Sequence, residues 1–219
     1  MRLAVVLFEG VTALDAIGPY EVLGSLPGVE TVFVGERPGP VRASAGGVGL
    51  VVDAGFGEVD AADVVVVPGG PGQARQMGGA LVEWVRHVDG GSRWTGSVCT
   101  GSLILAASGV LAGRRAATHW LAGQELAGLG VEHAVGERVV FDGKYVTAAG
   151  VSAGIDMGLA LAGELVGGFG AQMVQLALEY DPAPPFDAGS PERAPAEVVG
   201  LARENSRFLL WEEDRPDWA

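Results

Sequence analysis

Short Val-rich runs alternate with stretches of helical apolar spacing along most of the chain, and this alternation limits the possible folds more than any other feature. The runs Arg2–Phe8 and Asp63–Val67 are almost continuously apolar, whereas a strand with one wet face would alternate apolar and polar residues. Strands buried on both faces are typical of parallel sheets whose crossover helices cover both sides. The sequence therefore predicts a doubly wound α/β domain with a mainly parallel sheet and helices on both faces.

The expected elements follow this alternation. Strands are expected at 2–8, 29–35, 50–52, 63–67, 94–98, 116–118, 131–135, 138–141 and 145–148. Helices are expected at 12–26, 80–88, 102–109, 120–129, 152–165, 171–179 and 196–210. The Gly-rich stretch 39–49 fits a hairpin or a loop, and Asp142-Gly143 predicts the turn of a second hairpin.

The composition changes near the C-terminus, where a Pro-rich segment begins at Asp181. Such a segment favours an extended arm. We expect residues 1–190 to form the α/β domain, and residues 191–219 to form an extension whose short helix packs on the domain or on a partner subunit. Trp211 and Trp218 in this extension offer apolar surface for such a contact.

Charge and cysteine content narrow the classes of function. The formal net charge is -13, which opposes binding to nucleic acid or to an anionic membrane surface. The single cysteine excludes an intrachain disulfide, and the start of the chain resembles a buried strand rather than a signal peptide, so a cytoplasmic location is expected. Gly, Ala and charged residues divide the apolar runs, so no membrane span is expected.

Cys99 lies where the strand 94–98 must turn sharply into the helix 102–109. Gly96 and Gly101 permit the tight backbone of a strand-turn-helix nucleophile motif. The start of a helix lowers the pKa of a thiol and favours the thiolate, so Cys99 is a candidate nucleophile. A buried structural cysteine is an equal alternative from position alone.

Two other segments end at the same expected sheet edge. The backbone N–H of Gly70, with that of Thr100, is a candidate two-donor hole for developing negative charge; an ordinary loop is the alternative. Asp15 is a candidate proton donor whose pKa burial would raise, with Glu9 and Glu21 as competitors. A helix-terminal role for Asp15 is the alternative.

His119 is the candidate base for a Cys–His pair, and capping of the helix from Trp120 is its equal alternative. His87 and His133 fall on an expected helix end and an expected strand. The spacings of metal ligands and the Gly-rich motifs of nucleotide binding are absent from the sequence. We expect no metal and no organic cofactor.

Four segments carry a family resemblance: PGGPG, SVCTGSLILAASGVLAGRRAATHW, GVSAGIDMGLALAGELVG and VQLALEYDPAPPFDAGSP. With these segments the chain resembles the DJ-1/PfpI superfamily, and within it the isonitrile hydratase branch. The similarity runs from the first expected strand to the Pro-rich arm. It implies a flavodoxin-like α/β fold, a cysteine enzyme without a cofactor, and a homodimer.

The resemblance also implies roles for single residues. Cys99 would be the nucleophile and Asp15 the carboxylate that faces it, where most of the superfamily has glutamate. Thr100 stands where other members have histidine, and His119 would lie near the site without completing a catalytic triad. The implied reaction adds water to a small neutral isonitrile through a thioimidate on Cys99 and yields an N-substituted formamide.

Other functions stay open. The superfamily also implies a DJ-1-like glyoxalase or protein-repair enzyme, which a glutamate and a Cys-His pair would favour. A ligand-sensing domain related to transcription regulators is a further alternative. A peptidase or a redox sensor would use the same thiol.

Overall fold

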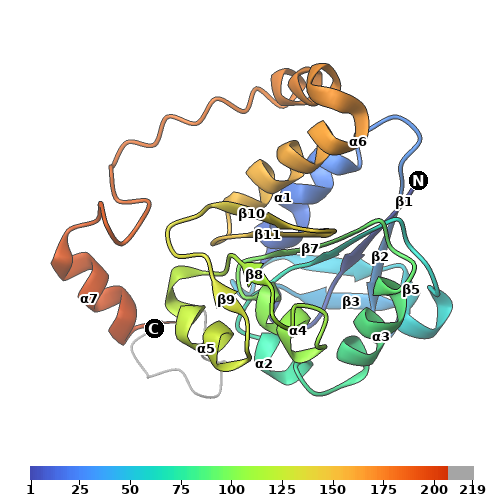
Figure 1. Cartoon of the computed structure of the whole chain (residues 1–219), viewed down its shortest axis with the longest axis horizontal. Coiled ribbons are helices and arrows are strands. Elements are labelled where there is room, and N and C mark those ends of the chain that lie inside the picture. The colour runs from blue at the N-terminus through green and yellow to red at the C-terminus, as the bar shows by residue number, and fades with distance from the viewer. Residues whose placement is uncertain (207–219) are drawn as a thin grey trace.

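A seven-stranded sheet forms the centre of the protein in the computed structural model, which describes residues 1–206 (Figure 1). Its strands are β1 (Arg2–Val6), β2 (Glu30–Gly35), β5 (Ala54–Gly55), β6 (Val64–Val67), β7 (Trp94–Val98), β10 (Val139–Asp142) and β11 (Tyr145–Ala148). Their order in the sheet is β10-β11-β7-β6-β1-β2-β5. Every neighbouring pair is parallel except the β10–β11 hairpin, so the predicted mainly parallel sheet is confirmed.

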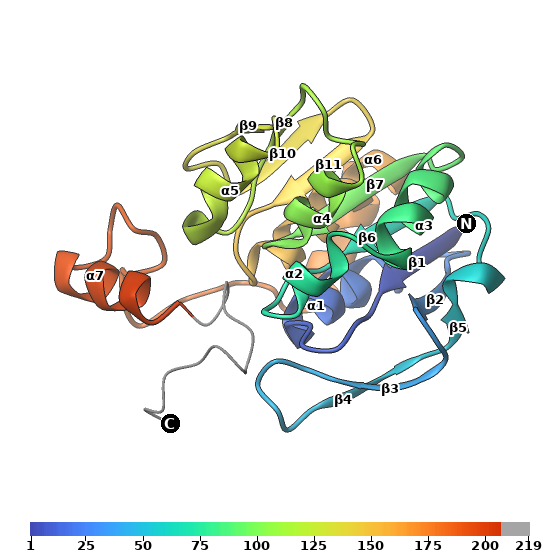
Figure 2. The same ribbon diagram turned by 90° about the horizontal axis from the view of Figure 1, so that it is seen from below.

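Helices cover both faces of this sheet. They are α1 (Ala13–Leu23), α2 (Gln73–Gln76), α3 (Ala80–Asp89), α4 (Gly101–Ala107), α5 (Gly123–Gly128), α6 (Ala153–Ala177) and α7 (Ala196–Glu204), with the short turns η1 (Phe56–Glu58) and η2 (Trp120–Ala122). Figures 1 and 2 show α1 and α6 on one face, and α3 and α4 on the other. The residues of β1 explain this: Leu3 and Val5 join one apolar core, and Ala4 and Val6 join the other.

The strand order brings the candidate site residues together at the carboxyl ends of the parallel strands. β1 has β2 on one side and β6 on the other, although β6 follows much later in the chain. Ligands of doubly wound sheets bind beyond the carboxyl ends of the strands at such a switch point. The segments that follow β1, β6 and β7 therefore converge, and they carry Asp15, Gly69 and Cys99.

Several expected elements differ in detail from the observed ones. The stretch 39–49 and the strand 50–52 form a separate hairpin of β3 (Gly39–Arg42) and β4 (Gly49–Val52). The strands expected at 116–118 and 131–135 reduce to a two-residue pair, β8 (Arg115–Ala116) and β9 (Glu132–His133). The short elements α2, β5 and η1 were not predicted, because segments of two to four residues carry too little periodicity.

The helices expected at 152–165 and 171–179 join in α6, which is interrupted at Gly167. Its backbone there has φ 80° and ψ 162°, which glycine adopts without a Cβ clash. By length and composition α6 is long and apolar enough to cross a membrane, contrary to the expectation that no segment would be. Its first half, however, buries Met157 and Leu161 in the core shared with α1, as a core helix does.

The C-terminal segment leaves the domain as an extended arm. Residues 181–195 contain no helix or strand, and α7 begins at Ala196. The guanidinium of Arg203 lies 5.7 Å from the ring centre of Trp120, which joins α7 to the domain at η2. The remainder of the helix expected at 196–210, together with Trp211 and Trp218, lies outside the described residues. The domain boundary at 190 stays a prediction.

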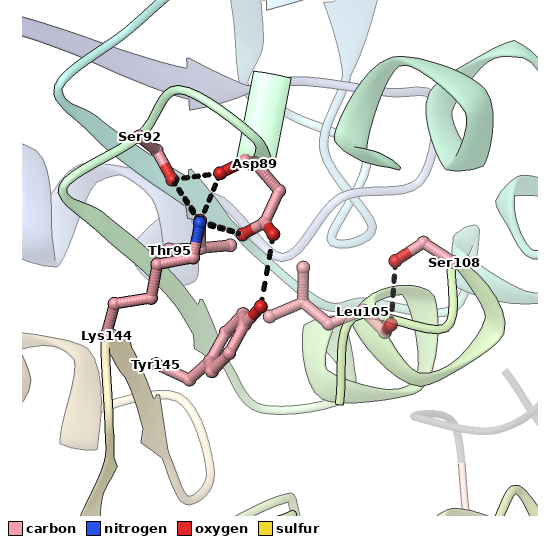
Figure 3. Close-up of polar contacts among 7 residues, drawn as sticks. All are labelled: Asp89, Ser92, Thr95, Leu105, Ser108, Lys144 and Tyr145. Carbon is pink, nitrogen blue, oxygen red and sulfur yellow. Dashed lines mark hydrogen bonds and ion pairs between the residues drawn. The ribbon is translucent and has the colours of Figure 1, made fainter. Parts of the chain in front are cut away.

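A buried polar cluster lies at the amino ends of β7 and β11, whereas Cys99 follows the carboxyl end of β7. Figure 3 shows the residues of this cluster. The carboxylate of Asp89, at the end of α3, accepts hydrogen bonds from Thr95 Oγ1 at 2.7 Å and Tyr145 Oη at 3.1 Å. Lys144 Nζ pairs with the same carboxylate at 3.2 Å, and Ser92 Oγ lies 2.8 Å from Thr95 Oγ1. The cluster therefore ties α3 to the first residues of β7 and β11.

We predict that Asp89→Ala lowers the free energy of unfolding by about 2–4 kcal/mol, because it removes the buried carboxylate that accepts hydrogen bonds from the hydroxyls of Thr95 and Tyr145 and pairs with Lys144. The control is Asp187→Ala, which removes an exposed carboxylate paired with Arg193 and should change stability by less than about 0.5 kcal/mol. Urea unfolding measures both. Equal stability of Asp89→Ala and the wild type would contradict the role given to the cluster.

Candidate active site

Cys99 occupies a strained turn between β7 and α4, as predicted. It is fully buried and has a φ of +58°, a conformation uncommon for residues other than glycine. Its N–H donates to the carbonyls of Ala148 at 3.1 Å and Ala149 at 2.9 Å. Its carbonyl accepts from Ser102 Oγ and Thr118 Oγ1, each at 3.2 Å. These contacts hold the turn in the geometry of a nucleophile elbow.

Asp15, in the first turn of α1, is brought to Cys99 and is also fully buried. Its Oδ2 accepts the N–H of Gly69 at 3.0 Å, and the thiol of Cys99 donates a hydrogen bond to the carboxylate. Oδ1 is buried without a nitrogen or oxygen partner. The side chain therefore does not cap its own helix. The competitors Glu9 and Glu21 are exposed at the surface.

Burial dominates the electrostatics of this pair. It raises the pKa of Asp15 to about 7, although the hydrogen bonds from Gly69 and Cys99 oppose the shift. It also raises the pKa of the Cys99 thiol well above its ordinary value, and the nearby Asp15 carboxylate raises it further. The raised pKa of Asp15 agrees with the prediction, whereas the lowered pKa expected for Cys99 is wrong, because loss of hydration outweighs the helix N-terminus.

The loop after β6 has a different role from the one predicted. The N–H of Gly70 donates to Thr100 Oγ1 at 3.0 Å, so this donor is already engaged and does not form a hole with the N–H of Thr100. The N–H groups of Thr100 and Val151 instead donate to the Cys99 sulfur. Val151 was missed in the sequence. Its φ of +28°, unusual for a β-branched residue, sets it apart only in the structure.

His119 takes the structural alternative. Its Nδ1 accepts the N–H of Leu121 at 3.3 Å and so caps η2. Burial lowers the pKa of His119 to about 4, which keeps the ring neutral at pH 7. His87 lies in the last turn of α3 and His133 in β9, as expected.

Within residues 1–206, no three His, Cys, Asp or Glu side chains are grouped so that they could hold a metal ion. The site instead consists of a carboxyl group, a thiol, the Thr100 hydroxyl and backbone N–H donors.

The sequence profile described as the DJ-1/PfpI family matches residues 1–164, which include all the site residues above. The chain belongs to the DJ-1/PfpI family. It is 45% identical over 207 residues to isonitrile hydratase from Pseudomonas putida, covering 94% of this chain and 90% of that enzyme. It is 31% identical to the HTH-type transcriptional regulator CdhR of Pseudomonas aeruginosa over 68% of this chain and 48% of the regulator.

Solved structures of DJ-1/PfpI proteins have the same fold. A THiJ/PfpI family protein from Pseudomonas syringae, 37% identical, superposes with a TM-score of 0.90 over 95% of this chain and 87% of its own. DJ-1beta of Drosophila melanogaster, 26% identical, has a TM-score of 0.74 over 81% of this chain and 97% of its own. Both the family and the fold inferred from the sequence are thereby confirmed.

The buried carboxyl predicts a specific pH dependence of stability. Because the pKa of Asp15 is about 7 in the folded protein and close to 3.8 in the unfolded chain, the folded state binds more protons between these values. The contribution of Asp15 to the free energy of unfolding should therefore be greatest near pH 4. It should fall by about 1.4 kcal/mol for each pH unit between about 4 and about 7.

Asp15→Asn should remove this slope, so that its stability relative to the wild type rises as the pH increases from 5 to 7. Urea unfolding at several pH values below 8, where the thiol is protonated in the folded and unfolded chain, measures the difference. Parallel stability curves for the two proteins would show that Asp15 is ionised throughout.

Proposed function

We propose that this protein is an isonitrile hydratase, which adds water to the carbon of an isonitrile and releases an N-substituted formamide. The observation that carries the proposal is the buried Asp15 carboxyl hydrogen bonded to the Cys99 thiol. Aspartate at this position and Thr100 after the cysteine agree with the hydratase branch. Further support comes from the 45% identity to the Pseudomonas putida enzyme over nearly the whole chain.

In the first half of the reaction, the ionised carboxylate of Asp15 takes the proton of the Cys99 thiol as sulfur attacks the isonitrile carbon. A carbon–sulfur bond forms, one π pair of the carbon–nitrogen triple bond moves to nitrogen, and the carbon keeps its lone pair as a carbanion. Asp15 then delivers the same proton to that carbon. The product of this half is a thioimidate on Cys99, and Asp15 is ionised again.

In the second half, Asp15 takes a proton from water as the water oxygen attacks the thioimidate carbon, and that proton passes to nitrogen. The remaining hydroxyl proton then returns through Asp15 to sulfur as the carbon–sulfur bond breaks. Formamide leaves, and the thiol and the carboxylate are restored. A carboxyl with a pKa of about 7 suits both directions of transfer near neutral pH.

Thr100, Gly70 and His119 support these steps in our proposal. The Thr100 hydroxyl accepts the N–H of Gly70, which leaves its own proton to orient water or substrate. Gly70 thus acts through Thr100 rather than on the substrate. The neutral ring of His119 adds no charge near the thiol, which suits an uncharged isonitrile. Every proposed step uses only the side chains of Cys99, Asp15 and Thr100, together with water.

We also propose that the protein acts in the cytoplasm as a homodimer. The second half of α6 and the following arm expose large apolar side chains, among them Phe169 at 81%, Leu176 at 76% and Phe186 at 78%. Large apolar side chains exposed along α6 and the arm favour a contact with a second copy. The reduced state of a buried thiol suits a reducing compartment.

The reaction assay gives the main prediction. Purified wild type should convert an alkyl isonitrile to the formamide, Cys99→Ala should give no turnover, and Asp15→Asn should lose at least about 100-fold in kcat because proton transfer is removed. Formamide is measured by chromatography. The control is Glu21→Gln, which neutralises an exposed carboxylate on the same helix and should keep the wild-type rate. A wild type inactive on isonitriles, or an Asp15→Asn variant of normal rate, would contradict the proposal.

The oligomeric state gives a separate prediction. Phe169→Asp should shift the protein from dimer toward monomer in sedimentation equilibrium, because a charge cannot be buried unpaired in an apolar contact. Val135→Asp, at another exposed apolar residue (74%), is the control and should leave the dimer intact. A wild type that sediments as a monomer would rule out the homodimer.

A further inference from the structure

The carbonyl of Cys99 accepts a hydrogen bond from a residue outside α4, Thr118, which has no role in the reaction steps described above. Thr118 Oγ1 donates to this carbonyl at 3.2 Å, and Thr118 is only 3% exposed. The other donor, Ser102, lies in the first turn of α4 and moves with Cys99. Among the described residues, Thr118 is the hydroxyl donor that ties the Cys99 carbonyl to a separate segment.

That segment is itself fixed on both sides of Thr118. The N–H of Ala117 donates to Thr147 Oγ1 in β11 at 2.8 Å. His119 caps η2 through the N–H of Leu121. A donor anchored to the sheet on one side and to a capped turn on the other can restrain its acceptor, whereas a donor on a mobile loop would follow it.

The restraint matters because of the backbone at Cys99. A non-glycine residue at φ +58° relaxes toward the β or α region unless its neighbours oppose the change. Such a change in φ would rotate the Cys99 carbonyl away from Thr118 and turn the Cα–Cβ bond with it. The sulfur would then leave the N–H groups of Thr100 and Val151 and the carboxyl of Asp15, which all act on it.

We propose that Thr118 is a positioning residue for the reaction at Cys99: its hydroxyl locks the strained turn and thereby fixes the sulfur between Asp15 and the N–H groups of Thr100 and Val151. The inference rests on the proposed isonitrile hydration for its kinetic consequence. Its structural consequence, the reactivity of the thiol, does not depend on the substrate.

The kinetic test compares Thr118→Val, which removes the hydroxyl at nearly constant volume, with Thr118→Ser, which keeps it. We expect kcat for an alkyl isonitrile to fall about 5- to 50-fold in Thr118→Val with KM changed less than about twofold, and to stay within about twofold of wild type in Thr118→Ser. Thr118→Ala is the second hydroxyl-free variant if Thr118→Val does not fold.

Ser108→Ala is the matched control. Ser108 is equally buried. Its hydroxyl donates to the carbonyl of Leu105 at 2.7 Å, at the C-terminal end of α4, the helix that Cys99 precedes (Figure 3). Removing it deletes the same kind of bond away from the site. Ser108→Ala should lose thermal stability comparable to Thr118→Val while keeping the wild-type kcat.

The second readout is the pH dependence of Cys99 alkylation by iodoacetamide, which needs no isonitrile. In Thr118→Val the sulfur moves away from the Asp15 carboxylate, which raises the thiol pKa more than either N–H donor lowers it, so the midpoint should fall by about half a pH unit or more. In Thr118→Ser and Ser108→Ala it should match the wild type. A Thr118→Val variant with normal kcat and a normal alkylation midpoint would overturn the inference, whatever its melting temperature.

The two hypotheses fail separately. A wild type inactive on isonitriles whose alkylation midpoint still depends on the Thr118 hydroxyl would overturn the proposed reaction and leave the positioning role standing. An active wild type whose rate and midpoint are indifferent to that hydroxyl would overturn only the positioning role.

Discussion

An ionised carboxylate inside a protein loses its hydration, and Asp15 has one backbone donor, the N–H of Gly69, and one thiol to replace it. The free-energy cost of desolvation that remains uncompensated holds the pKa of Asp15 near 7 and keeps Cys99 protonated beside it. Two negative charges in this space are strongly disfavoured. Once Asp15 ionises, the pair holds a single proton, on sulfur, and the proposed chemistry consists of moving that proton between sulfur, carboxyl, substrate and water.

The sheet makes this burial possible by joining three segments from distant parts of the chain. β1 and β6 lie together at the switch point, so α1 presents Asp15 to the loop that carries Gly69 and Gly70. That loop lies directly against Thr100, so closely that a Cβ on Gly69 would overlap its hydroxyl. Glycine is thus required by close approach. The Asp89 cluster fixes the other end of β7, so that Cys99 ends a strand held at both ends.

Much of this was accessible from the sequence, and the exceptions share a cause. Continuous apolar runs predicted the sheet, and local residue types predicted the Cys99 turn. For Asp15 a helix-terminal role stayed open from the residues, and the family resemblance implied its place facing Cys99. The pKa of Cys99 was misjudged because a helix N-terminus is visible in sequence, whereas complete desolvation is a tertiary property. The Gly70 donor was misassigned and Val151 was overlooked for the same reason: the direction of a backbone N–H depends on how loops pack, which no local pattern encodes.

The proposed chemistry depends on a pKa of Asp15 near 7, which leaves the carboxyl protonated at pH 5 to 6 and ionised, able to take the Cys99 proton, above pH 7. Infrared difference spectra between the wild type and Asp15→Asn test it directly, since only a protonated carboxyl has the carbonyl stretching band of the free acid. A band of this type at pH 5 to 6 that is absent from Asp15→Asn and titrates with a midpoint near 7 is the predicted result. Its absence at pH 5 to 6 would mean that Asp15 is ionised there, and would contradict a pKa of Asp15 near 7.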